Sequence, residues 1–110
     1  MATTTYKVLG QSNPAATTST ALYTVPASTQ AVISTISVCN QASSDATFRV
    51  SVSVAGAAIS AKEYIAYDAT VRANGFVTLT LGISLGAADV IRIYGSSATL
   101  SFSAFGTELA

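Results

Sequence analysis

The chain has 110 residues, of which 50% are hydrophobic and only 9% are charged, with five basic and five acidic side chains. Its mean hydropathy is +0.52, yet no uninterrupted stretch reaches the roughly 18 apolar residues that a membrane span needs. The basic residues are scattered singly, so we expect neither nucleic-acid binding nor membrane binding. The first residues lack a basic start followed by an apolar block, so we also expect no export signal.

We expect one domain of moderate core size, preceded by an arm. Residues 1–20 are predicted to form an extended N-terminal arm with a short first strand at 6–9. The rest of the arm, residues 10–20, contains Pro14 and no large apolar side chain, so it is not expected to supply a core strand.

The next two predicted strands differ in how they bury their side chains. Residues 21–25 form a strand that ends at Pro26, which cannot donate a hydrogen bond to a neighbouring strand. Residues 31–39 carry apolar groups on both faces, which predicts a central strand covered on both sides. One face has Val32, Ile36 and Val38, and the other has Ile33 and Cys39. The lone Cys39 is interpreted as a small buried hydrophobic residue.

Residues 46–54 have the clearest pattern in the chain, because apolar and polar side chains alternate. This period of two predicts a half-buried strand. The side chains predicted to face the core are Phe48, Val50, Val52 and Val54. Those on the opposite face are Thr47, Arg49, Ser51 and Ser53. A second layer must cover the apolar face.

The remaining segments continue the alternation of short strands and turns. Residues 57–67 are predicted as a strand, with a helical turn at 61–64 as the alternative, and residues 68–75 form a loop ending in Asn74-Gly75. Further strands are predicted at 76–81, 89–94 and 99–105. The result is an all-β protein, an antiparallel β-sandwich of jelly-roll type with about eight short strands. The sandwich domain is placed at 21–106, with a tail at 107–110.

Residues suited to catalysis are few. The chain has no His and one Cys, which removes the usual general base and the thiolate zinc sites. The five acidic residues lie in five different segments, where carboxylates usually accept hydrogen bonds from local backbone amides. We therefore expect no enzymatic activity, no metal and no cofactor, and no small-molecule ligand.

The low charge points instead to contact with other proteins. Uncharged Ser, Thr and Ala side chains are easily buried, since no ion loses its hydration. The candidate partner-contact residues are Tyr23, Tyr64, Tyr67, Ser51 and Ser53. Together with Tyr94, the tyrosines could also form an aromatic site for a glycan. A third interpretation, more common for Tyr at strand ends, is that their rings belong to the core.

Six strings spread over nearly the whole chain carry a resemblance to a known family. They are YKVLGQ at 6–11, LYTVPA at 22–27, ISVCN at 36–40, ATFRV at 46–50, YIAYD at 64–68 and LSFSAFG at 100–106. In these strings the chain resembles a family of small β-sandwich structural proteins of tailed bacteriophages, including cyanophages, and of prophages. The strings are strand and turn residues without catalytic meaning.

The resemblance implies a virion protein that is assembled in the cytoplasm of the bacterial host. It would act as a capsid decoration (cement) protein or as a neck, tail or baseplate accessory. Its expected partners are copies of itself, in a homo-oligomer such as a trimer, and other virion proteins. The alternative function is a glycan-binding module of a tail fibre that recognises the host surface.

Overall fold

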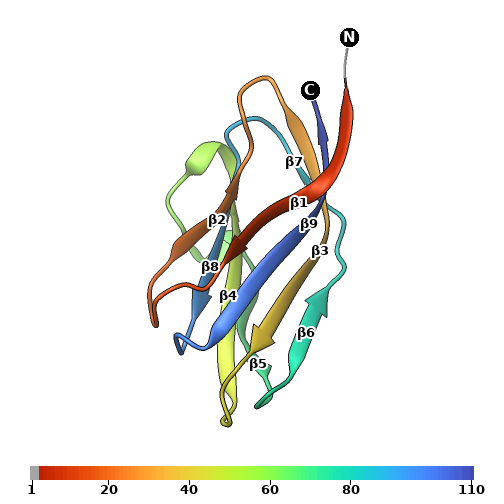
Figure 1. Cartoon of the computed structure of the whole chain (residues 1–110). Coiled ribbons are helices and arrows are strands. Elements are labelled where there is room, and N and C mark those ends of the chain that lie inside the picture. The colour runs from red at the N-terminus through yellow and green to blue at the C-terminus, as the bar shows by residue number, and fades with distance from the viewer. Residues whose placement is uncertain (1–2) are drawn as a thin grey trace.

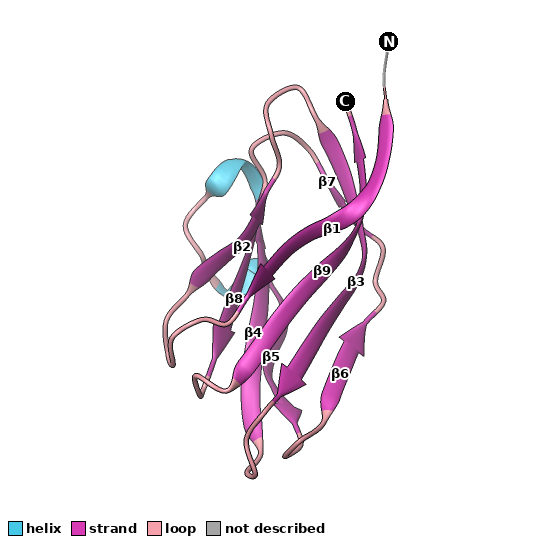
Figure 2. Ribbon diagram, viewed as in Figure 1, coloured by secondary structure: helices cyan, strands magenta, loops and turns pink. Residues whose placement is uncertain are grey.

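The computed structural model describes residues 3–110, so residues 1 and 2 of the predicted arm lie outside the described residues. It consists of two antiparallel β-sheets packed face to face (Figures 1 and 2). The strands are β1 (Thr4–Ser12), β2 (Thr20–Thr24), β3 (Gln30–Asn40), β4 (Ala46–Ser53), β5 (Tyr64–Val71), β6 (Phe76–Leu79), β7 (Ile83–Leu85), β8 (Val90–Gly95) and β9 (Leu100–Leu109). Two short 3₁₀ turns, Val54–Gly56 and Ala61–Glu63, lie between β4 and β5.

The strand order confirms the predicted jelly-roll sandwich. The first sheet has the order β1-β9-β3-β6, with β7 also paired to β3, and the second has the order β2-β8-β4-β5. Strands β6 and β7 pair with successive parts of β3, so together they form one edge strand that is interrupted near Gly82, where φ is +64°. Counted as one, they leave eight strands in the interleaved order of a jelly roll. Segment 83–85, which lies between the strands predicted at 76–81 and 89–94, is the second half of this edge strand.

The core lies between the sheets and joins β4 to β9. Phe48 and Phe102 meet edge to face across the sandwich, with ring centroids 6.2 Å apart and an interplanar angle of 70°. Phe48 and Val50 are fully buried and Val52 packs against the same cluster, as the alternation predicted. Val54 is 69% exposed, because the chain leaves the strand at the first 3₁₀ turn.

Strand β3 is covered on one face only, so its predicted two-sided burial is wrong. A β-bulge between Ile33 and Thr35 inserts one extra residue opposite β9. The bulge shifts the alternation by one position, and it brings Ile33 and Ile36 to the same buried face. Val32 and Cys39 consequently face outward and are exposed, so the prediction of a buried Cys39 is also wrong.

Residues assigned to the arm and the tail take part in the first sheet. Strand β1 begins at Thr4 and pairs antiparallel with β9, which continues to Leu109. Beyond β1, Asn13 donates hydrogen bonds to the carbonyl oxygens of Ala98 and Leu100, at 2.9 and 2.6 Å. The described part of segment 1–20 and most of segment 107–110 are therefore integral to the sandwich. Figure 1 shows the start of β1 and the end of β9 on the same side of the molecule.

The chain between β4 and β5 differs from the predicted strand at 57–67. Residues 54–63 leave the sheet and return through the two 3₁₀ turns, and the strand begins only at Tyr64. It then continues through Asp68, which has a φ of +50°, and ends at the buried Val71. The predicted loop at 68–75 therefore begins after Val71. The helical-turn alternative at 61–64 describes the second 3₁₀ turn.

Candidate functional site

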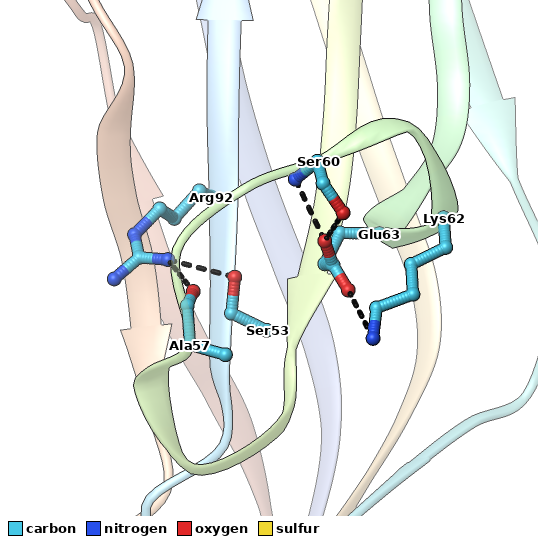
Figure 3. Close-up of polar contacts among 6 residues, drawn as sticks. All are labelled: Ser53, Ala57, Ser60, Lys62, Glu63 and Arg92. Carbon is cyan, nitrogen blue, oxygen red and sulfur yellow. Dashed lines mark hydrogen bonds and ion pairs between the residues drawn. The ribbon is translucent and has the colours of Figure 1, made fainter.

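Residues 54–63, here called the strap, cover part of the outer face of the second sheet. Arg92 of β8 binds the first half of the strap. Its Nη1 donates hydrogen bonds to Ser53 Oγ at 2.7 Å and to the carbonyl oxygen of Ala57 at 3.0 Å (Figure 3). Within the second half of the strap, Glu63 accepts hydrogen bonds from the Ser60 amide at 2.7 Å and from Ser60 Oγ at 2.6 Å. These bonds, led by the one from the Ser60 side chain, lower the pKa of the Glu63 carboxyl.

The strap removes two of the candidate partner-contact residues from the surface. Ser51 and Ser53 lie on the outer face of β4, as predicted, but they are 2% and 0% exposed. Neither side chain is exposed for contact with another protein, because this chain's own strap covers both. The alternation of β4 shows which face a side chain is on, but not whether a loop returns over that face.

Tyr23 is also unavailable to a partner. It is buried in β2, and its hydroxyl crosses the sandwich to donate a hydrogen bond to the Glu108 carboxylate of β9. Lys7 Nζ of β1 lies 2.9 Å from the same carboxylate. Burial, reinforced by the neighbouring carboxylate, raises the pKa of the Tyr23 phenol. The hydrogen bond from Tyr23, followed by that from Lys7, lowers the pKa of Glu108.

The two remaining candidates lie together on β5, in an aromatic cluster around Arg49. The rings of Tyr64 and Tyr67 are 4.9 Å apart and nearly perpendicular, at 82°. The Arg49 Cζ atom lies 4.2 Å from the ring centroid of Tyr67 and 4.4 Å from that of Tyr94. Arg49 Nε also binds Asp68 Oδ1 at 2.7 Å, and this hydrogen bond raises the pKa of Arg49.

A bulge in β5 builds this cluster. Phe48 pairs with Ala69 and Val50 with Ala66, so two residues of β5 stand opposite the single Arg49 between them. Those two residues are Tyr67 and Asp68. One therefore places its ring, and the other its carboxylate, against the same guanidinium group.

The sequence grouped the tyrosines but did not identify what joins them. Tyr64 and Tyr67 lie together, as a shared aromatic patch requires. Tyr94 contacts the same Arg49 guanidinium as Tyr67, whereas Tyr23 lies elsewhere. Arg49 and Tyr94 are direct cross-strand partners in β4 and β8. This pairing depends on strands that are far apart in the sequence, so no local pattern could reveal it.

Beside the cluster, the surface has an open hollow of about 590 Å³. It is lined by Ser60 and Ala61 of the strap and by Tyr64 and Tyr67 of β5. Tyr67 is 58% exposed there. The hollow therefore offers aromatic surface together with hydroxyl groups, which suits a ligand that has both apolar and polar groups.

The outer surface of the first sheet, here called the uncharged face, is the second candidate site. The strands of this sheet contain only two charged residues, Lys7 and Glu108. These two form an ion pair, and Glu108 also accepts the hydrogen bond from the buried Tyr23. Apolar side chains nevertheless lie exposed on this face, among Ser and Thr. They are Tyr6, Val8, Val32, Phe76, Phe105 and Leu109.

Two acidic residues stabilise turns. Asp89 accepts hydrogen bonds from the Ala55 amide at 2.9 Å and the Gly86 amide at 2.8 Å, and Asp45 accepts one from the Ala73 amide at 2.9 Å. Within residues 3–110, no three His, Cys, Asp or Glu side chains gather in a group that could hold a metal ion. In the same part of the chain, no helix has the length and apolar character needed to cross a membrane.

Neither a comparison with protein-family models nor a search of curated proteins finds a match for this chain. The resemblance to phage structural proteins therefore remains an expectation from the sequence.

Proposed function

We propose that this chain is a non-enzymatic virion structural protein of a tailed bacteriophage. It assembles with copies of itself, in a homo-oligomer such as a trimer, and with other virion proteins. Its place is that of a capsid decoration (cement) protein or of a neck, tail or baseplate accessory, and it is assembled in the host cytoplasm. The observation that carries the proposal is the uncharged face of the first sheet.

The physical support comes from desolvation. Burying a charged side chain against a partner requires the loss of its hydration, whereas Ser, Thr and apolar side chains are buried at much lower cost. Exposed apolar side chains gathered on one surface are typical of protein contact sites. The uncharged face combines both features, since Val8 and Phe105 are cross-strand partners with exposed side chains.

The fold is compatible with this role. Jelly rolls occur in viral capsid domains and also in lectin domains. A fold alone does not establish a function, so the topology supports the proposal only together with the uncharged face and the resemblance of the six strings to phage structural proteins.

The first test is the oligomeric state of the purified chain by size-exclusion chromatography with light scattering. Val8→Lys places a charge on the uncharged face, so it should dissociate the oligomer. Thr70→Lys is the matched control, because Thr70 is exposed on β5 of the other sheet and its substitution should leave the oligomer intact. Equal behaviour of the two variants would exclude the uncharged face as the contact.

The second test locates the protein. Purified particles of the phage that encodes the chain should contain it, as detected by mass spectrometry, and cryo-electron microscopy should place it on the head, neck or tail. A parent chain that is monomeric at every concentration and missing from purified particles would overturn the proposal.

A further inference from the structure

We propose that the hollow beside Tyr64 and Tyr67 is a carbohydrate-binding site that receives a neutral pyranose ring. It lies on the second sheet, whereas the uncharged face belongs to the first sheet. This binding function goes beyond the proposed role in particle assembly, and the two can be present or absent independently.

The walls of the hollow match the two kinds of surface on a sugar. A pyranose has apolar C–H groups on its faces and hydroxyl groups around its edge. Tyr64 and Tyr67 meet at nearly a right angle, so their rings offer apolar surface in two directions. Their phenol oxygens, with Ser60 Oγ, offer hydrogen-bonding groups beside that surface. Ser60 Oγ donates its proton to Glu63 and therefore has lone pairs left to accept a bond.

The charges around the hollow favour an uncharged ligand. Arg49, behind Tyr67, is bound to Asp68 through both Nε and Nη2, at 2.7 and 3.4 Å. Glu63 is held by Ser60, with Lys62 Nζ 3.9 Å away. Each of these ions lies beside one of opposite charge, so the described side chains around the hollow have no net charge that would favour a phosphate, a carboxylate or an ammonium group.

The site is also preorganised. The Arg49 guanidinium packs on Tyr67, and the β5 bulge sets the position of that ring. The strap, which supplies Ser60 and Ala61, is bound to β8 through Arg92, and the hydrogen bond from Ser60 to Glu63 stabilises its second 3₁₀ turn (Figure 3). A ligand therefore meets side chains that are already in place, which reduces the entropy lost on binding. The volume of about 590 Å³ lies within the range of roughly 300–1,000 Å³ typical of ligand pockets.

Saturation-transfer NMR on the full chain tests the proposal directly. The probes are the methyl pyranosides of glucose, galactose, mannose and N-acetylglucosamine. At least one should receive saturation at its ring protons. Tyr67→Ala should weaken binding about tenfold, the factor expected for loss of one aromatic contact. Leu81→Ala, which removes an apolar side chain that is 55% exposed outside both the hollow and the uncharged face, is the control and should leave binding unchanged.

Ala61→Arg provides a test that does not depend on the tyrosine cluster, because it fills the hollow from the exposed strap. It should abolish saturation transfer while the far-ultraviolet circular dichroism spectrum stays that of the parent. The proposal is overturned if the parent transfers saturation to none of the four sugars. It is equally overturned if Ala61→Arg, correctly folded, binds as the parent does, since the sugar would then lie elsewhere. Neither result alters the expected oligomeric state, which depends on the other sheet.

Discussion

Asn40 offers a sharp test of how the loops at one end of the sandwich are held together. It ends β3 and is buried, and its Nδ2 donates to the carbonyl oxygens of Ser44 and Val71 at 2.9 and 3.2 Å. Its Oδ1 accepts bonds from the Ala42 amide at 3.0 Å and from Thr99 Oγ1 at 3.1 Å. Asn40→Asp retains the shape of the side chain but replaces the donating amide with a carboxyl group.

The expected loss of stability follows from those bonds. Each lost hydrogen bond to a buried group costs about 1–3 kcal/mol, so losing the two donations to Ser44 and Val71 should lower the free energy of unfolding by about 2–6 kcal/mol. A domain of this size has a total stability of about 5–15 kcal/mol. The variant should therefore unfold at a much lower urea concentration at neutral pH.

The loss should also depend on pH. Burial and the facing carbonyl oxygens raise the pKa of the introduced carboxyl in the folded state above the value of about 3.9 that an unfolded chain has. As the pH rises above about 4, the unfolded state ionises first and the variant becomes less stable. Below that pH the carboxyl is protonated in both the folded and the unfolded state and can donate one hydrogen bond. The difference in free energy of unfolding between variant and parent should therefore become smaller.

Urea unfolding followed by circular dichroism, at neutral pH and near pH 4, measures both effects. Asn13→Asp is the matched control, because Asn13 also donates from Nδ2 to two carbonyl oxygens but is exposed, so water can hydrate the new carboxylate. Asn40→Asp should lose more stability than this control. Parent-like stability of Asn40→Asp at neutral pH would refute the assigned network, and an equal loss in both variants would refute the role of burial.

Three further predictions concern the first sheet. Gly106→Ala should lower the melting temperature strongly, because the added Cβ would lie 2.0 Å from a backbone carbonyl oxygen of β3, whereas Gly86→Ala meets its nearest atom only at 3.8 Å and should be mild. Acidification should destabilise the parent more than Glu108→Gln. The hydrogen bond from Tyr23 lowers the pKa of Glu108, so the stability that this carboxylate contributes is lost as the pH falls through its pKa. Parallel curves of stability against pH for the two proteins would contradict this. Deletion of residues 1–18 should reduce or abolish cooperative melting, because it removes the strand paired with β9; unchanged melting would mean that β1 adds no stability.

Local patterns in the sequence were sufficient for the fold class and for much of the strand assignment. The alternation along 46–54 predicted the inward Phe48 and Val50, and turn residues such as Asn74-Gly75 separated the strands. Side-chain period and turn chemistry are properties of neighbouring residues, so they can be read without knowing the tertiary structure.

Bulges and strand pairing escaped the same reasoning. The extra residue in β3 moved Val32 and Cys39 to the surface, and the extra residue in β5 joined Tyr67 and Asp68 to Arg49. A bulge is defined by a partner strand far away in the sequence, so the chain on its own does not reveal which residues it will displace.

Burial by the protein's own loops was decided only by the tertiary structure. Ser51 is a polar residue on the outer face of a strand, and nothing in its neighbours shows that the strap returns over it. The polar strand β1 likewise joins the sheet through backbone hydrogen bonds, which every sequence can make. The sequence by itself determined the inward face of the regularly alternating strand β4, through Phe48 and Val50. Tertiary structure determined which outward side chains stay in contact with solvent, because that depends on contacts between distant segments.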